Sequence, residues 1–326
     1  MAGTGEERKP AELLAAARGG QRRAVARLLT LVERGGGAAE AIAAATHPLT
    51  GAAHIVGITG APGTGKSTLT GALTTLLAAE GRRPAVVAVD PSSPLTGGAI
   101  LGDRVRMEAA TGAGVFIRSM ATRGHAGGLA LAVPGVVRVL DACGFDPVLV
   151  ETVGVGQIEV DVAAAADTAV VVVTPGWGDA IQANKAGLLE VADLFVVNKA
   201  DRPGASDARR DLDLMLDLSE VSGAAAGTGA DAESRPAIIE TTATEGEGVQ
   251  DLLRAVDAHH RALKAGPGLQ ARRDRRFVAE VRARLEHVLI QAADDVLVDV
   301  DSRSGATPVE AARHLADRFL DTDTPR

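Results

Sequence analysis

The amino-acid sequence predicts an α/β fold: a doubly wound, mostly parallel sheet with N-terminal helices and a C-terminal helical arm. Short Val/Ile-rich runs alternate with helical segments, and the runs are apolar at consecutive positions, as in strands covered on both faces. The predicted strands are His54–Thr59, Ala85–Val89, Val115–Ser119, Pro147–Thr152, Thr168–Thr174, Leu194–Asn198 and Pro236–Thr241. The predicted helices between them include Lys66–Glu80, Gly128–Ala142, Ala205–Leu218 and Gly248–Leu263.

The helical ends of the chain divide it into three predicted parts: a helical segment over 1–50, the α/β domain over 51–266, and a helical extension over 267–326. In the extension, residues 271–292 carry one apolar stripe among charged side chains. A further helix starts at Thr307, which forms a capping box with Glu310. The apolar stripe has two interpretations, packing on its own domain or pairing with a second subunit, and the residues favour neither.

Composition excludes several classes of function. The chain has 326 residues with a formal net charge of −8, which gives no reason to expect nucleic acid or an anionic membrane as a partner. Cys143 is alone, so neither an intramolecular disulfide nor a cysteine metal cage is expected. No apolar run approaches the ~20 residues of a membrane span, so we expect a cytoplasmic protein.

A glycine-rich loop follows the first predicted strand and matches the pattern G-x-x-x-x-G-K-[ST]. The motif and the next residue are Gly60, Ala61, Pro62, Gly63, Thr64, Gly65, Lys66, Ser67 and Thr68. In such a loop the backbone N–H groups surround phosphate oxygens, the lysine reaches the β- and γ-phosphates, and the hydroxyl binds Mg²⁺. The helix that begins here adds its positive N-terminal dipole. The loop therefore predicts a nucleoside triphosphate site.

A second motif predicts that the base is guanine. Asn198, Lys199 and Asp201 follow an apolar strand, and ligands of open α/β sheets bind at that end of the strands. The Asp201 carboxylate can accept hydrogen bonds from the ring N–H and exocyclic amine of guanine, whereas adenine would leave it unpaired. The Lys199 stem can lie over the base, and Asn198 can connect neighbouring loops. After the next strand, the backbone of Thr241, Thr242 and Ala243 is a further candidate for contact with the guanine oxygen.

Acidic residues between these motifs are candidates for Mg²⁺ binding and catalysis. Asp90 and Asp103 follow the second predicted strand, although both could simply cap loops. Glu151 ends the strand before Gly154, where P-loop NTPases place an acidic residue that holds Mg²⁺. Gln157 is a weaker candidate for positioning water. Lys185 lies on a glycine-rich segment after a strand, either as a solvated helix residue or in a loop that changes with the nucleotide state.

Five longer runs resemble the MeaB/ArgK family of P-loop GTPases over about residues 10–295. They are DPSSPLTGGAILGDRVRM, RSMATRGHAGGLA, ETVGVGQIEVDVA, TPGWGDAIQANKAGLLEVAD and VVNKAD. The resemblance implies a GTPase with GTP or GDP and Mg²⁺ as ligands. It places Lys66, Ser67, Asp90, Asp103 and Glu151 around the phosphates and Asp201 at guanine, and it places Lys185 in an additional switch. Thr241-Thr242-Ala243 departs from the commoner Ser-Ala pair.

The same resemblance implies a function as a chaperone of an adenosylcobalamin-dependent acyl-CoA mutase of the methylmalonyl-CoA mutase type. Such a chaperone gates cofactor loading and protects the mutase, and the mutase's adenosyltransferase is a further candidate partner. The resemblance also implies a homodimer formed through the C-terminal extension. No cobalamin site is identified in the chain itself.

Two other classes of protein also use a P-loop. A metal-inserting GTPase would need a Cys/His cluster near the switches, but the chain has one cysteine and seven dispersed histidines. A small-molecule kinase would use ATP, which the Asn198–Asp201 motif argues against. Because no catalytic base is evident near Glu151, we expect slow intrinsic GTP hydrolysis that a partner stimulates.

Overall fold

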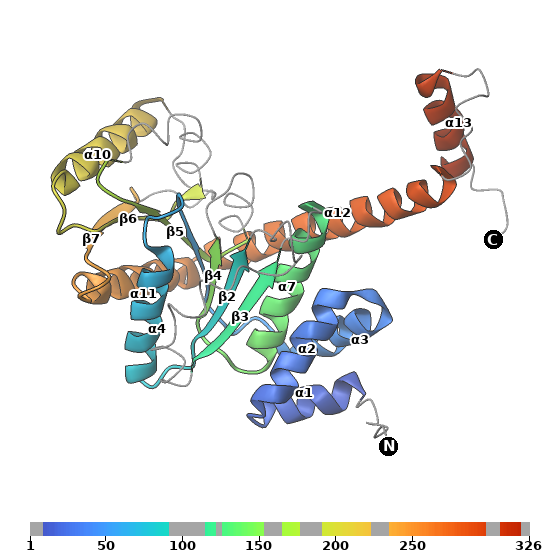
Figure 1. The fold of residues 1–326 in the computed structure, drawn as a ribbon, viewed down its shortest axis with the longest axis horizontal. Coiled ribbons are helices and arrows are strands. Elements are labelled where there is room, and N and C mark those ends of the chain that lie inside the picture. The colour runs from blue at the N-terminus through green and yellow to red at the C-terminus, as the bar shows by residue number, and fades with distance from the viewer. Residues whose placement is uncertain are drawn as a thin grey trace. The chain divides into compact units, whose positions relative to one another are not determined.

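Seven parallel strands form one sheet in the order β3-β2-β4-β1-β5-β6-β7 (Figure 1). The structure is a computed structural model that describes residues 9–90, 115–121, 126–152, 165–176, 191–222, 235–297 and 307–320. The strands are β1 Ile55–Thr59, β2 Ala85–Asp90, β3 Phe116–Ala121, β4 Val148–Thr152, β5 Thr168–Val173, β6 Leu194–Asn198 and β7 Ala237–Thr241. All seven predicted strands are therefore confirmed, and their ends differ from the predicted ones by at most two residues.

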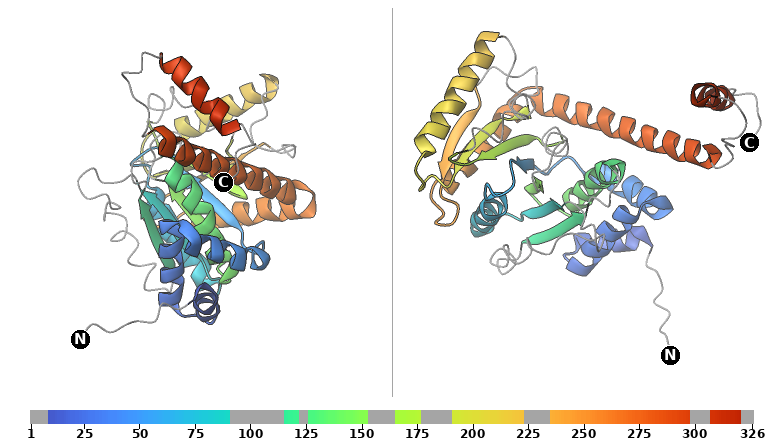
Figure 2. Two further views of the ribbon diagram at one scale, coloured as in Figure 1. Left: turned by 90° about the vertical axis from the view of Figure 1, so that its right-hand side faces the viewer. Right: turned by 45° about the horizontal axis from the view of Figure 1, so that its top comes forward.

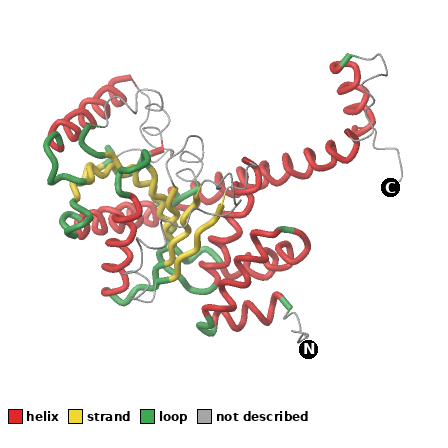
Figure 3. The backbone as a smooth tube through the Cα atoms, viewed as in Figure 1, coloured by secondary structure: helices red, strands yellow, loops and turns green. Residues whose placement is uncertain are grey.

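Helices cover both faces of the sheet (Figure 3), and the interior strands β1, β4, β5 and β6 are buried along their whole length. On one face, α4 (Lys66–Ala79) and α11 (Val249–Ala265) pack against side chains such as Val56 of β1 and Val170 of β5. On the other face, α7 (Ala126–Ala142) and α10 (Ala205–Ser222) pack against the alternate side chains. This is the doubly wound arrangement that the uninterrupted apolar strands predict.

Three N-terminal helices extend the layer formed by α7 (Figure 2). They are α1 (Pro10–Arg18), α2 (Arg22–Arg34) and α3 (Gly36–Thr46), and the 3-10 turn His47–Leu49 follows them. Leu28 and Leu29 of α2 are fully buried and share one core with α7. These helices are thus built into the hydrophobic core of the α/β fold.

Two compact units divide the chain, residues 1–278 and 279–326. The long helix α12 (Gly268–Leu297) contributes to both units, and α13 (Pro308–Leu320) belongs to the second. The predicted capping box is confirmed: the Thr307 backbone N–H donates to Glu310 Oε2 at 2.9 Å, and the Glu310 N–H donates to Thr307 Oγ1 at 3.3 Å.

Arginines in the first turns of α12 bind carboxylates at the amino-terminal edge of the sheet. Arg272 donates two hydrogen bonds to Asp193, of 2.7 and 2.6 Å, and both side chains are buried. Arg276 donates to Asp167 Oδ1 at 3.3 Å and to the Ala165 carbonyl at 2.8 Å. Asp193 precedes β6 and Asp167 precedes β5, so the arginines connect α12 to the start of two central strands.

Buried histidines lie at the same edge. His54 Nε2 is 2.8 Å from Thr168 Oγ1, which is in turn 2.8 Å from His259 Nδ1. The rings of His54 and His260 meet edge to face, with centroids 3.7 Å apart. Burial, helped by the charges of neighbouring basic groups, lowers the pKa of His54 to about 2. The protein is therefore built around the neutral form of this side chain.

Candidate functional site

The glycine-rich loop connects the carboxyl end of β1 to the first turn of α4, as the sequence predicts. Gly60 adopts φ +140°, and a Cβ there would lie 2.1 Å from the Val172 carbonyl oxygen on β5. Gly65 adopts φ +90°, and a Cβ there would lie 2.4 Å from Asn198 Nδ2. Both glycines are thus required by close contacts as well as by conformation.

Lys66 begins α4 and bends back over the loop. Its Nζ donates hydrogen bonds to the carbonyls of Gly60, at 2.5 Å, and Ala61, at 2.9 Å. The side chain is buried although it carries a charge. The ammonium is therefore held within the turn, where backbone N–H groups and the α4 dipole also favour an anion.

Ser67 and Glu151 bring a hydroxyl and a carboxylate together at the carboxyl edge of the sheet. Ser67 Oγ donates a hydrogen bond to Glu151 Oε1 at 2.6 Å. Next to them, the hydroxyl of Thr152 on β4 donates to Thr59 Oγ1 on β1 at 3.0 Å, and both threonines are buried. The sequence does not predict this threonine pair, because a threonine within a strand belongs to no motif.

Asn198 joins the predicted base loop to the phosphate loop through both ends of its amide. Its Nδ2 donates to the Thr64 carbonyl at 2.8 Å. Its Oδ1 accepts hydrogen bonds from Thr241 Oγ1, at 3.0 Å, and from the Ala243 backbone N–H, at 3.2 Å. Asn198 is buried, and both its amide nitrogen and its amide oxygen have hydrogen-bond partners. The connecting role that the sequence suggests for Asn198 agrees with these bonds.

Lys199 makes a second connection between the two loops. It has φ +60°, a left-handed conformation that is uncommon outside glycine, and its Nζ donates to the Gly63 carbonyl at 2.7 Å. Asp201 is exposed two residues further on. The backbone N–H of Thr242 donates to the Glu247 carbonyl at 3.1 Å, so the amides of Thr242 and Ala243 both have partners within the chain.

Several predicted site residues lie outside the described part of the chain. These are Asp103, Gln157 and Lys185; of Asp90 only the backbone, at the end of β2, is described. The described residues thus bring together Lys66, Ser67 and Glu151 with the Asn198–Asp201 loop. They form no group of three or more His, Cys, Asp or Glu side chains arranged to hold a metal, and no described helix could cross a membrane.

This fold and these two motif loops define a P-loop GTPase. The chain belongs to the family described as methylmalonyl Co-A mutase-associated GTPase MeaB, whose model matches residues 25–296. It is 47% identical over 291 residues to a Pyrococcus horikoshii protein named as a GTPase, covering 89% of this chain and 90% of that protein. GTP hydrolysis is therefore its activity, and guanine nucleotide is its ligand.

Two further similarities are relevant to function. A solved structure described as an LAO/AO transport system kinase matches with a TM-score of 0.69 at 27% identity, covering 96% of this chain and 98% of that one. A fused isobutyryl-CoA mutase of Cupriavidus metallidurans is 41% identical over 197 residues, which are 59% of this chain and 18% of that protein. A sequence related to this chain is thus part of a protein named as a fused acyl-CoA mutase.

Proposed function

We propose that the protein is a GTP-dependent chaperone of an adenosylcobalamin-dependent acyl-CoA mutase, which gates cofactor loading and protects the enzyme. The observation that carries this proposal is the match to a protein named as a fused isobutyryl-CoA mutase, in which a related sequence is part of the same polypeptide. The description of the family as mutase-associated supports it. A methylmalonyl-CoA mutase is the expected client, and its adenosyltransferase is a further candidate partner.

Our proposed nucleotide site uses the two loops that Asn198 and Lys199 hold together. The backbone of the phosphate loop and Lys66 bind the phosphate chain, and Asp201 accepts hydrogen bonds from guanine. Asp90, Asp103 and Lys185 remain proposed switch residues around the γ-phosphate. The bonds from Asn198 Nδ2 and Lys199 Nζ to the carbonyls of Thr64 and Gly63 support this assignment, because they fix the base loop beside the phosphate loop.

Magnesium fits the donors that the structure brings together. Mg²⁺ binds hydroxyl, carboxylate, water and phosphate oxygens, and Ser67 Oγ and Glu151 Oε1 are 2.6 Å apart. Ser67 and Glu151 would hold the ion, with Asp90 and Asp103 as further proposed ligands. When bound, the ion neutralises charge on the phosphates. Glu151 also holds the Ser67 hydroxyl in place.

The helical extension over 267–326 is our proposed dimerisation arm. Val281, Leu285, Val288 and Leu289 recur at helical spacing on α12, and each is about half exposed, from 49% to 59%. A stripe of this kind is typical of a helix that pairs with another helix. A homodimer formed through this stripe is the arrangement we propose, and the molar mass in solution measures it.

Affinity capture tests the proposed client. The full chain is immobilised with a non-hydrolysable GTP analogue or with GDP, exposed to extract of its native cells, and the retained proteins are identified by mass spectrometry. We expect an adenosylcobalamin-dependent acyl-CoA mutase, retained to different extents in the two nucleotide states. The variant Lys66→Ala should lose that nucleotide dependence. Recovery of no cobalamin enzyme in either state would refute the chaperone role.

A further inference from the structure

Two threonine hydroxyls connect the strands that lead into the nucleotide site. Thr59 is the last residue of β1 and precedes Gly60 of the phosphate loop, and Thr152 is the last residue of β4 and follows Glu151. The Thr152 hydroxyl donates to Thr59 Oγ1 at 3.0 Å. The exposed fractions of the two residues are 1% and 0%, so bulk water does not compete for this hydrogen bond. The hydroxyl pair is therefore an internal link between the two strands.

This hydrogen bond lies directly beyond the backbone pairing of β1 with β4. The backbone register of the two strands ends with Ile58 beside Glu151. Thr59 and Thr152 are the next residues along each strand. On the other side of β4, the backbone of Thr152 pairs with Val89 of β2. The hydroxyl pair thus extends the attachment of β4 to β1 by one residue, to the point where both strands end.

The threonine pair and the proposed magnesium donors lie on opposite faces of the sheet. Successive side chains of a strand alternate between the faces, so Thr152 and Glu151 point to opposite sides. Glu151 meets Ser67 of α4, whereas Val150, on the same side of β4 as Thr152, packs in the core that includes α7. The hydroxyl pair therefore acts on Glu151 through the backbone of β4.

The position of Glu151 relative to the phosphate loop depends on how β4 is attached to β1. Gly60, next to Thr59, accepts a hydrogen bond from Lys66 Nζ at 2.5 Å, so the end of β1 carries the phosphate loop directly. Mg²⁺ requires nearly octahedral geometry with oxygen ligands at about 2.0–2.1 Å. A small displacement of the Glu151 carboxylate from the phosphates would therefore weaken its contribution to hydrolysis.

We propose that Thr152 and Thr59 are positioning residues for GTP hydrolysis, and that their hydroxyl pair fixes the Glu151 carboxylate relative to the phosphate loop. This inference rests on the proposed magnesium site and adds to it two residues that touch neither nucleotide nor ion. Thr152→Val keeps the size and shape of the side chain but cannot form the hydrogen bond. Thr152→Ser keeps the hydroxyl.

GTP turnover by the full chain, measured over a range of Mg²⁺ concentrations, tests the proposal. We expect Thr152→Val to lower kcat about tenfold and to raise the Mg²⁺ concentration for half-maximal turnover about threefold or more, because Glu151 is held less precisely. GDP affinity without Mg²⁺ should change by less than about twofold, because the phosphate loop and Asp201 are retained. Thr152→Ser should restore kcat and the Mg²⁺ dependence to within about twofold of wild type.

A double-variant comparison tests whether the two hydroxyls act as one unit. Thr59→Val should reproduce the defect of Thr152→Val. The variant that carries both changes should have a kcat no lower than either single variant, because all three lose the same hydrogen bond. Multiplied defects in the double variant would overturn the proposal.

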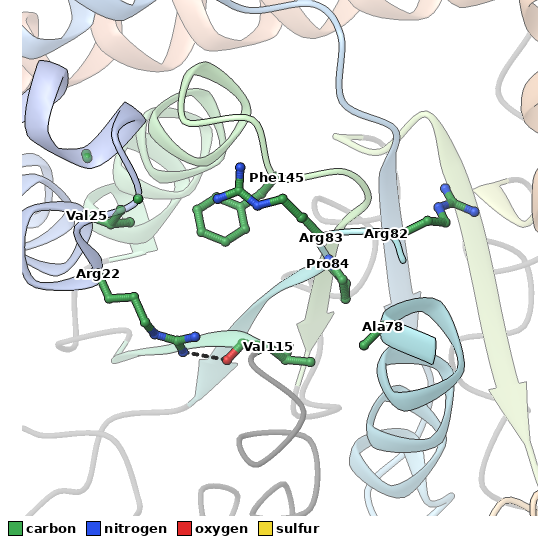
Figure 4. Close-up of a pocket in the computed structure, with 10 residues that line it drawn as sticks. Arg22, Val25, Ala78, Arg82, Arg83, Pro84, Val115 and Phe145 are labelled. Atoms are coloured by element: carbon green, nitrogen blue, oxygen red, sulfur yellow. Dashed lines mark hydrogen bonds between the residues drawn. The ribbon is translucent and has the colours of Figure 1, made fainter. Parts of the chain in front are cut away.

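Two control variants separate positioning from a general loss of stability. Thr46→Val removes an equally buried hydroxyl, which donates to the Ile42 carbonyl at 2.8 Å in α3. Phe145→Leu opens space before the amino end of β4, where Phe145 lines a pocket of about 290 Å³ and its ring centroid lies 5.0 Å from the Arg83 guanidinium (Figure 4). Both changes should lower the unfolding temperature and leave kcat and the Mg²⁺ dependence unchanged.

The positioning role and the magnesium site fail in different ways. Wild-type kcat and Mg²⁺ dependence in Thr152→Val would overturn the positioning role, as would an equal defect in Thr152→Ser or in either control variant. Wild-type turnover by Glu151→Gln would overturn the magnesium site itself. A defect in Glu151→Gln with none in Thr152→Val would retain the magnesium site and remove the threonine pair from its support.

Discussion

Arg272 and Asp193 form a buried ion pair with two hydrogen bonds, with side-chain exposures of 9% and 4%. Burial by itself would raise the pKa of Asp193, but hydrogen bonds from His259 and Arg272 outweigh it and hold the pKa below its ordinary value. The carboxylate also accepts the Ala169 backbone N–H at 2.8 Å. The Asp193 side chain therefore connects α12, α11 and β5.

The first prediction concerns this pair. Arg272→Ala leaves a buried carboxylate without its main counter-charge and should lower the free energy of unfolding by about 3–5 kcal/mol. Urea unfolding followed by circular dichroism measures the change. The control Arg210→Ala removes an exposed pair with Asp207 and should cost less than about 1 kcal/mol. If Arg272→Ala and Arg210→Ala lowered the unfolding free energy equally, the buried pair would contribute no more to stability than the exposed one.

The pH dependence of stability follows from His54. Its pKa is about 2 in the folded chain and 6.5 in the reference state, so the unfolded chain binds more protons between these values. Stability from the neutral ring is complete above pH 6.5 and falls as the pH decreases, by up to about 1.4 kcal/mol per pH unit. His54→Gln cannot titrate, so its unfolding free energy should depend less steeply on pH between 6.5 and 5. An unchanged slope would exclude His54 as the cause.

The phosphate loop offers a matched pair of glycine substitutions. Gly60→Ala places a methyl group 2.1 Å from a carbonyl oxygen of β5 and should cost more than about 3 kcal/mol of unfolding free energy. Gly63 has φ +79°, and a Cβ added there would have no heavy atom within 4 Å. Gly63→Ala should therefore lower the free energy of unfolding only through the left-handed conformation, by about 1–2 kcal/mol. Thermal unfolding compares them. A larger effect at Gly63 would contradict the close packing of Gly60.

Base recognition can be tested by a substitution at Asp201 that changes a hydrogen-bond acceptor into a donor. Asp201→Asn replaces an acceptor oxygen with an amide that can donate, so it suits xanthine, which carries a carbonyl where guanine has an amine. We expect GDP affinity to fall about 100-fold and xanthosine diphosphate to bind more tightly than to the wild type. Fluorescence competition measures both. Asp207→Asn, on the exposed surface of α10, is the control, and an Asp201 variant with unchanged GDP affinity would refute the assignment.

Glu151 tests the proposed magnesium site. Glu151→Gln keeps the shape of the side chain and its hydrogen bond from Ser67 but removes the charge. GTP turnover should fall on the order of 100-fold, while GDP binding, measured without Mg²⁺, should change little. Glu240→Gln removes an exposed carboxylate paired with Arg209 and should leave turnover unchanged. Wild-type turnover by Glu151→Gln would exclude Glu151 from the hydrolytic step.

The sequence predicts the strands well because buried parallel strands are continuous apolar runs, a local signal. Asn198–Asp201 and the glycine-rich loop are also local, and their position at strand ends follows from the strand pattern. The pairs Arg272–Asp193 and Arg83–Phe145 have no such signal. The two residues of each pair are 79 and 62 positions apart in the sequence. Nothing in the local sequence distinguishes an arginine that forms such a pair from other arginines outside the motifs.

The amide of Asn198 has a consequence for the thermodynamics of nucleotide recognition. The Asn198 amide binds Thr64 on one side and Thr241 and Ala243 on the other. The phosphate loop and the base loop are therefore already aligned when the chain has folded. Much of the conformational entropy of these loops is thus lost during folding and not during association. A ligand that contacts both loops meets a preorganised surface, so its affinity is reduced less by the cost of ordering the protein.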